Sequence, residues 1–241
     1  MKLFLVVLLI AVHTVSTNDA IVRKGERFTP NSIMRHLFEM LRNVIRKGDS
    51  DKNIQPTDPY KFPYAEFYFR ETFLRLQANI SHGIINGLGD FEVLKSDFIK
   101  EAVAVDLDIT FPFLNFEAEH YEMEGSLFHD AFPLSGMGLL QFTIHNLNFC
   151  SKVYLKQSED EKAILIDRFE NPYFSIEQIT SRTQFDDNFD DIFNAMIEDL
   201  LADYLTRFSG YLASSYGSYL IGILNKYFMH FESWRIITVI L

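Results

Sequence analysis

The chain has 241 residues, of which 48% are hydrophobic and 15% aromatic, and its formal net charge is −11. This length and apolar content suffice for one domain with a sizeable core, and the negative charge argues against nucleic acid and anionic membrane surfaces as partners. The single cysteine, Cys150, excludes an intrachain disulfide, so the fold must depend on packing.

The chain begins with the pattern of a secretory signal peptide. Met1-Lys2 precedes an apolar run from Leu3 to Ala11, and small and polar residues follow up to Thr17. Because this run is too short to cross a bilayer, the pattern favours cleavage near residue 17 and secretion over an uncleaved anchor. Residues 18–241 are then expected to form a single domain, and Asn79 of the Asn-Ile-Ser sequon is a candidate glycosylation site.

A first helix is predicted shortly after the signal peptide. Thr29 suits the N-cap, Pro30 suits the first helical position, and apolar residues recur at helical spacing as far as Ile45. The helix should end at Lys47-Gly48, where a cation meets the negative helix end and Gly allows a left-handed cap. Residues 49–63 contain three prolines among polar residues, which predicts a linker on the surface.

From residue 72 onwards the apolar period changes from that of a helix to two, as in half-buried strands. Residues 72–80 alternate in this way, and the clearest alternation runs from Val103 to Phe113, against Asp106, Asp108 and Thr110. Weaker strand patterns cover residues 139–149, 152–155, 163–169 and 174–183. Since no helix signal separates them, we expect an antiparallel meander rather than a parallel sheet.

The last long element is an apolar stripe that keeps helical spacing from Asp186 to Phe231. At about 1.5 Å per residue it would be roughly 65 Å long, so its partner must be elongated too. The sequence therefore predicts an α+β fold in which a highly curved antiparallel sheet wraps around a long C-terminal helix and encloses an apolar lumen. Glycines predict a break in this helix near residues 209–210 or 214–218.

The lumen is the candidate binding site, and its lining is predicted from two faces. The sheet would contribute Val103, Val105, Leu107, Ile109, Phe111 and Phe113, and the helix Phe193, Ile197, Leu200, Tyr204 and Phe208. A chain with 24 Phe and 11 Tyr residues can leave adaptable apolar space between a helix and a sheet, although a core filled by its own side chains is the alternative. A strand register shifted by one residue would invert the sheet's half of this set.

The candidate motifs for catalysis and metal binding lack residues or structural context that these functions require. Asp106-Leu107-Asp108 resembles the aspartyl nucleophile motif of haloacid-dehalogenase-type phosphatases, but the strand alternation continues past it and leaves both carboxylates on the solvent face. The acidic cluster at 186–191 lacks the Gly and Glu of a calcium loop and suits a helix N-terminus instead. With no zinc-type spacing and no Gly-x-Ser-x-Gly elbow, we expect no enzyme, no metal and no cofactor.

Three stretches carry a family resemblance. They are Ile85-Asn86-Gly87-Leu88-Gly89-Asp90-Phe91-Glu92-Val93; Gly125-Ser126-Leu127 with Pro133-Leu134-Ser135-Gly136-Met137-Gly138 and Phe142-Thr143-Ile144-His145-Asn146; and the helix from Phe185 to Phe228. In this order they resemble the takeout and haemolymph juvenile-hormone-binding superfamily of secreted arthropod proteins. The resemblance implies a tubular lipid-binding fold and an extracellular carrier of a terpenoid hormone, fatty acid or other lipid.

One family feature is missing, namely the amino-terminal cysteine pair. The helix predicted in its place looks more like the group 7 mite allergen branch, which implies an alternative function: a non-catalytic interaction or immune-recognition protein with a filled core. A hydrophobic small molecule is the expected partner, with no nucleic acid and no stable membrane insertion, and any protein partner stays open.

Overall fold

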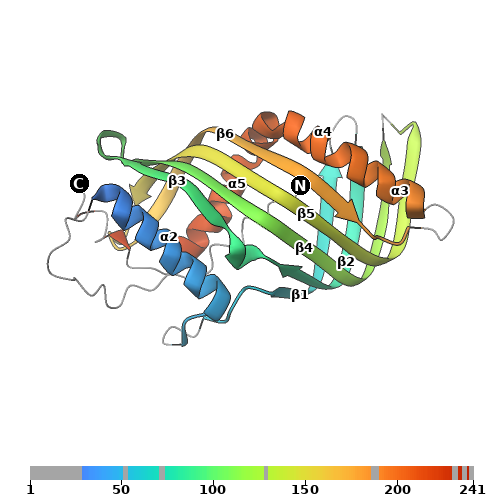
Figure 1. The fold of residues 1–241 in the computed structure, drawn as a ribbon, viewed down its shortest axis with the longest axis horizontal. Helices are drawn as coiled ribbons and strands as arrows, with labels where there is room; N and C mark the ends of the chain where they lie inside the picture. Colours follow the sequence, from blue (N-terminus) through green and yellow to red (C-terminus); the bar gives the residue numbers. More distant parts are fainter. Residues whose placement is uncertain are drawn as a thin grey trace.

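The computed structural model describes residues 29–50, 54–70, 74–127, 130–185 and 190–229, together with 233, 234 and 238. The predicted signal peptide lies outside these residues, as does most of the apolar C-terminal tail. The described elements are one N-terminal helix, six strands and a series of C-terminal helices (Figure 1). The predicted α+β class, with an extra N-terminal helix, is therefore confirmed.

Helix α2 (Pro30–Lys47) begins and ends where the sequence indicated. The Thr29 side chain accepts a hydrogen bond from the Ser32 N–H (3.3 Å), and Gly48 follows the last turn with a φ of +72°. The linker prediction is wrong at its far end, because strand β1 (Tyr60–Arg70) already includes its last residues. Aromatic side chains in β1 pack against the sheet, and Pro63 is tolerated because β1 is an edge strand.

The six strands form one antiparallel sheet. After β1 come β2 (Leu74–Asn86), η2 (Leu88–Asp90), β3 (Glu92–Ile99), η3 (Lys100–Ala102), β4 (Ala104–Leu127), β5 (Phe132–Gln157) and β6 (Ile164–Ser181). The order is β1-β2-β4-β5-β6, and β3 pairs with the first half of β4 while β2 pairs with its second half. The predicted antiparallel arrangement is confirmed, but the four weaker patterns merge into only two long strands, β5 and β6.

A break in side-chain alternation crosses the three longest strands. On β4, Phe111 and Leu114 are both fully buried, and between them Phe113 is 46% exposed. The residues paired with Phe111 and Leu114 show the same break on the neighbouring strands. They are Leu147 and Ile144 on β5 and Ile176 and Ile179 on β6, and each pair is buried although its members are three residues apart. Pro112 lacks an N–H for the ladder, and Asn146 takes a φ of +47°. Inward-facing residues on β4 thus change from odd to even numbers at this line.

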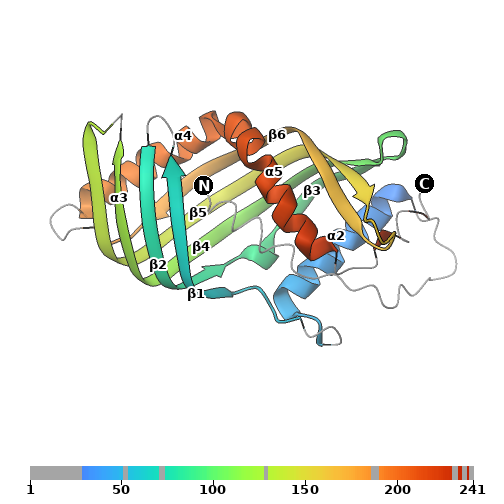
Figure 2. The same ribbon diagram turned by 180° about the vertical axis from the view of Figure 1, so that it is seen from behind.

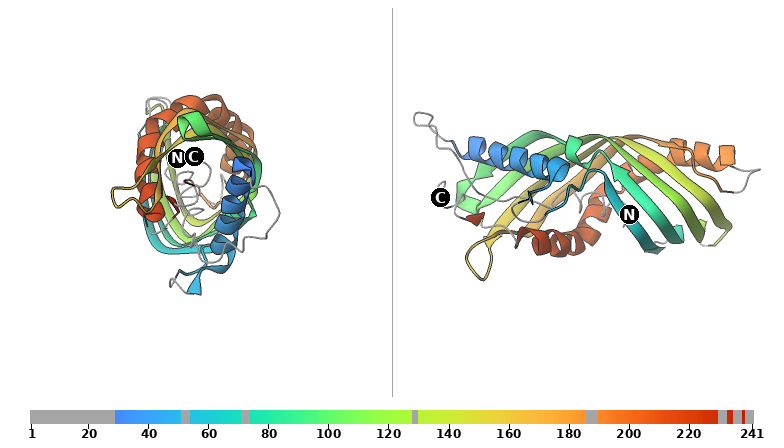
Figure 3. Two further views of the ribbon diagram at one scale, coloured as in Figure 1. Left: turned by 90° about the vertical axis from the view of Figure 1, so that its left-hand side faces the viewer. Right: turned by 90° about the horizontal axis from the view of Figure 1, so that it is seen from below.

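The C-terminal helices close the concave side of the sheet. They are α3 (Asp190–Met196), the π-helical η4 (Ile197–Leu201), α4 (Ala202–Arg207) and α5 (Ser209–Phe228). The chain breaks from helical geometry at Phe208, as the sequence predicted near this point, and continues unbroken through 214–218. Figure 2 shows α5 crossing the concave side, and the left view of Figure 3 shows strands and helices surrounding a central axis.

Polar side chains of these helices bind the free edge of β6. Asn225 accepts from the Ile166 N–H (2.7 Å) and donates to the Ile166 carbonyl (2.8 Å), and Thr206 accepts from the Ile176 N–H (2.8 Å). Further bonds join Asn194 to Thr183 and Glu198 to Ser181. These bonds replace the missing neighbouring strand, since an open edge would leave its N–H and C=O groups without partners.

Candidate functional site

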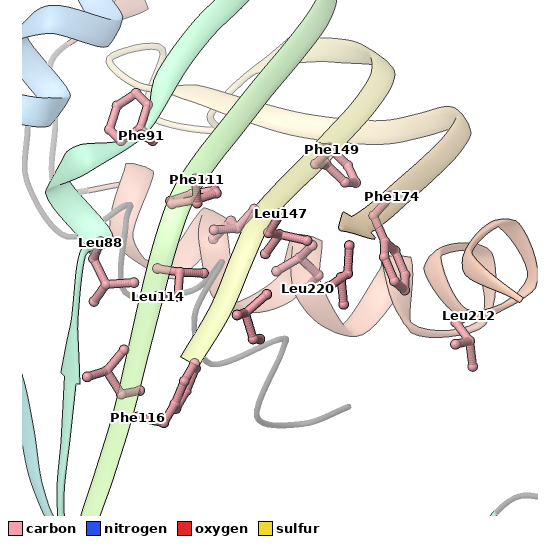
Figure 4. Packing of buried hydrophobic residues seen from close by; sticks show 14 of the residues in the cluster. Leu88, Phe91, Phe111, Leu114, Phe116, Leu147, Phe149, Phe174, Leu212 and Leu220 are labelled. Carbon is pink, nitrogen blue, oxygen red and sulfur yellow. The ribbon is translucent and has the colours of Figure 1, made fainter. Parts of the chain in front are cut away.

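The candidate site is the apolar interface between the concave face of the sheet and α5. Its buried side chains come from η2, all the long strands and the helices, and Figure 4 shows ten of them labelled. This central cluster includes Phe111, Leu114, Leu147, Phe174, Leu212 and Leu220. Every group in this set is hydrocarbon, so the interface offers contact area and dispersion rather than reactive chemistry.

The sheet residues predicted for the site fall into three groups. Leu107, Ile109 and Phe111 belong to the central cluster, and Phe111 is fully buried. Val105 instead packs under α2, in a separate cluster around Met34 to which Val103 also contributes. The expected shared face ends at Phe111, because the break in alternation turns Phe113 away from the core. The break depends on how β4 pairs with its neighbouring strands, and that pairing cannot be deduced from the sequence of one strand. The sequence therefore did not predict it.

Of the helix residues predicted for the site, some pack in the core and others are exposed. Ile197 packs against the central cluster, and the Phe193 ring lies 5.1 Å from that of Phe185. Tyr204 and Phe208 contact each other with ring centroids 4.6 Å apart. Leu200 is 60% exposed and Phe208 41% exposed, so neither is enclosed by the described core.

The π-helical turn explains part of this division. An extra residue in one turn rotates all later side chains around the helix axis, so a stripe drawn at constant helical spacing drifts out of line. In the structure Leu201, Ala202 and Leu205 face the core, and in α5 Leu212 and Leu224 are buried. The sequence stripe contained the α5 leucines, but the predicted lining was drawn only from the part of the stripe before Ser209.

The two aspartates of the phosphatase-like motif are paired with neighbouring side chains of the sheet. Lys95 binds Asp106 at 2.6 Å, and this hydrogen bond raises the pKa of the lysine. Asn148 donates to Asp108 at 2.6 Å. Burial, followed by the negative charge of Asp108, raises the pKa of the Cys150 thiol to about 11, so at neutral pH it is a protonated group rather than a nucleophile. Within the described part of the chain, no cluster of His, Cys, Asp and Glu could hold a metal ion.

The glycosylation candidate Asn79 lies in the middle of β2, between Glu66 on β1 and Glu122 on β4. It is half-buried, on a row that also includes exposed polar side chains. Among the described residues, no helix is both long and apolar enough to cross a membrane.

The profile of the family described as haemolymph juvenile hormone binding protein (JHBP) matches residues 3–238, which is nearly the whole chain. The chain belongs to this family. No curated protein sequence matches the chain.

The solved structures that are similar to this JHBP-family chain include a takeout protein and a lipopolysaccharide binding protein. Takeout 1 of Epiphyas postvittana has a TM-score of 0.49 and 12% sequence identity, over 78% of this chain and 85% of that one. A lipopolysaccharide binding protein has a TM-score of 0.30 and 10% identity, over 72% of this chain but only 37% of the other.

This member of the JHBP family holds its amino-terminal region without a disulfide, since it has one cysteine. Helix α2 is fixed to η2 and β3 by polar contacts instead. Arg46 forms an ion pair with Asp90, Arg42 donates to the Phe91 carbonyl (2.8 Å), and Asn31 accepts from the Phe98 N–H (2.9 Å). Apolar packing of Ile45, which is fully buried, adds to these contacts.

Proposed function

We propose that the protein is a secreted carrier that holds one hydrophobic small molecule between the concave face of the sheet and α5. Membership of the JHBP family supports this kind of function, and the hydrocarbon interface of Phe111, Leu147 and Leu212 supplies the matching surface. The observation that carries this proposal is that the interface joins a curved, unclosed sheet to α5, which crosses the concave side of the sheet (Figure 2). A terpenoid hormone, a fatty acid or another lipid fits such a surface.

Burial of apolar surface would supply most of the binding free energy. At about 25 cal/mol per Å² of apolar surface removed from water, enclosing a few hundred Å² of lipid contributes several kcal/mol. Association costs offset part of that gain, so we expect dissociation constants in the micromolar range. No proton transfer, metal or cofactor is needed for this mechanism.

Direct binding is the first test. The secreted protein is delipidated and titrated with a fluorescent fatty acid and with a fluorescent terpenoid, and native mass spectrometry is run on material that has not been delipidated. A saturable signal or a co-purifying lipid mass supports the carrier. The proposal fails if neither ligand saturates and the native protein has only its polypeptide mass.

A pair of variants tests where the ligand lies. Ala213 packs against the central cluster, whereas the next residue, Ser214, is exposed on α5. If the interface is partly hollow, Ala213→Leu keeps the protein folded and weakens ligand binding at least several-fold, while Ser214→Leu leaves binding unchanged. If the core is already full, Ala213→Leu instead lowers the free energy of unfolding by about 1–3 kcal/mol.

The alternative is a non-catalytic extracellular interaction or immune-recognition protein with a filled core. One observation favours it: Ile192, Met196 and Leu200 lie at four-residue spacing on the C-terminal helices and are exposed. A partner protein would cover such a stripe. Destabilisation by Ala213→Leu, together with loss of partner capture in Leu200→Asp, would favour this function over the carrier.

Secretion and glycosylation are proposed from the sequence. The apolar run from Leu3 to Ala11 predicts that the mature protein begins near Asn18, and Asn79 would carry the glycan on the half-buried row of β2. Expression in insect cells, amino-terminal sequencing of the medium fraction and treatment with a peptide N-glycosidase test both points. An intracellular protein that keeps Met1 would refute secretion.

A further inference from the structure

Ser209 is a buried polar residue at the start of α5. Its side chain is only 1% exposed, and its hydroxyl oxygen has no hydrogen-bond partner among the described residues. No other buried side-chain nitrogen or oxygen in the described part of the chain is unpartnered in this way. Leaving a buried hydroxyl unsatisfied costs about 1–3 kcal/mol, so such a group in a native protein calls for an explanation.

Ser209 lies on the inward face of α5. Residues three, four, seven and eleven positions further along the helix are Leu212, Ala213, Tyr216 and Leu220, and all of them pack in the central apolar cluster. Side chains at these spacings share one helix face. The hydroxyl therefore belongs to the same face as the hydrocarbon surface of the candidate site.

The same residue begins a helix. Phe208 leaves helical geometry (φ −99°, ψ 10°), and the first bond of α5 runs from the Leu212 N–H to the Phe208 carbonyl (2.9 Å). The N–H groups of Ser209, Gly210 and Tyr211 precede that bond, as the first N–H groups of any helix do. No acidic residue occupies the first turn of α5, whereas α3 begins with Asp190 and Asp191.

These observations combine into a polar anchor. We propose that the hydroxyl of Ser209 and the N–H groups of the first turn of α5 bind an acceptor oxygen at the head of an otherwise apolar ligand. This inference rests on the proposed function, because it requires a molecule between the sheet and α5. It places the polar head of such a ligand, a terminal carboxylate or ester carbonyl, at the start of α5.

The chemistry favours an acceptor over a donor. A helix N-terminus presents N–H donors and a positive partial charge, which stabilises an anion or a carbonyl oxygen. A hydroxyl group donates to the same atom without any proton transfer. In surroundings of low polarity a hydrogen bond to a charged acceptor is stronger than in water, so one such contact can decide between a fatty acid and an alkane of equal length.

The experiment compares tetradecanoic acid with tetradecane, each displacing a fluorescent apolar probe from the delipidated full-length protein. Ser209→Ala is compared with Ser214→Ala, which removes an exposed hydroxyl from the same helix. We expect Ser209→Ala to weaken the apparent affinity for the acid about 10-fold and to leave the apparent affinity for the alkane unchanged. The melting temperature of this variant should be no lower than that of the wild type. Ser214→Ala should change neither ligand.

Each other outcome has a defined meaning. If Ser209→Ala weakens the acid and the alkane equally, or weakens neither, the anchor is refuted and the carrier stands. If the wild-type protein releases the probe to neither compound, the anchor is refuted, and the carrier is judged separately by the terpenoid titration and by native mass spectrometry. Ser209→Thr serves as a second variant because it keeps a hydroxyl. This variant should retain the preference for the acid over the alkane, and loss of that preference would also overturn the proposal.

Discussion

The polar row that joins the helices to the edge of β6 leads to a quantitative prediction. Asn225 forms two hydrogen bonds with the backbone of Ile166, at 2.7 and 2.8 Å, and Ile166 is buried. Asn225→Ala would leave one N–H and one C=O of an edge strand without partners. At about 1–2 kcal/mol for each group, we expect the free energy of unfolding to fall by roughly 2–4 kcal/mol.

Urea denaturation followed by circular dichroism measures this loss, and a thermal scan should show a fall of about 5–15 °C for a chain of this size. Lys226→Ala is the matched control, because Lys226 is the next residue and is exposed; it should change stability by less than about 0.5 kcal/mol. Asn225→Asp should be intermediate, since it keeps the acceptor for the N–H but places a second acceptor against the carbonyl. Equal stability of Asn225→Ala and Lys226→Ala would refute the reasoning, because water would then satisfy the edge.

Three further predictions concern the core, a turn and the thiol. Phe111→Ala should lower the unfolding free energy by about 3–5 kcal/mol and Phe113→Ala by less than about 1 kcal/mol, both measured by urea denaturation; similar losses would contradict the break in alternation. Gly87→Ala should destabilise by about 2 kcal/mol or more, since φ is +92° and a Cβ would lie 2.3 Å from a backbone oxygen, while Gly222→Ala, with open space, should be neutral or stabilising in a thermal scan. Cys150 should react with iodoacetamide about 100-fold more slowly than glutathione at pH 8 and accelerate towards pH 11, as followed by mass spectrometry; a rate equal to that of glutathione would show that burial does not raise its pKa.

The sequence was most informative where local rules decide the structure. Thr29 and Gly48 mark the two ends of α2, because capping depends on residues within a few positions of each other. The alternation from Val105 to Phe111 correctly indicated one face of β4. The break before Ser209 followed from low helix propensity near Gly210. The antiparallel sheet followed from strands without helices between them. Each of these inferences needs only neighbours in the chain.

Features that depend on pairing across strands could not be predicted in this way. The change of face after Phe111 involves Pro112 on β4, Asn146 on β5 and the matching position of β6, which are brought together only by the register. The π-helical turn at Ile197 likewise has no sequence marker among ordinary helix formers, yet it moves Leu200 out of the predicted lining. Strand β1 was missed because it contains Pro63 and because its aromatic residues do not alternate cleanly.

Polar residues inside the last helices were also overlooked, because an amphipathic reading assigns them to solvent. In the structure these polar residues fall into two groups, those that bind the edge of β6 and one that does not. Asn194, Thr206 and Asn225 turn towards β6 and satisfy backbone groups that a neighbouring strand would otherwise bind. Ser209 lies on the apolar face instead and has no such partner in the described chain. Because the edge of β6 binds Asn194, Thr206 and Asn225, a ligand in the proposed site would meet mainly hydrocarbon from the cluster and the Ser209 hydroxyl near the start of α5. Such an arrangement would favour a lipid with a polar head over a plain hydrocarbon.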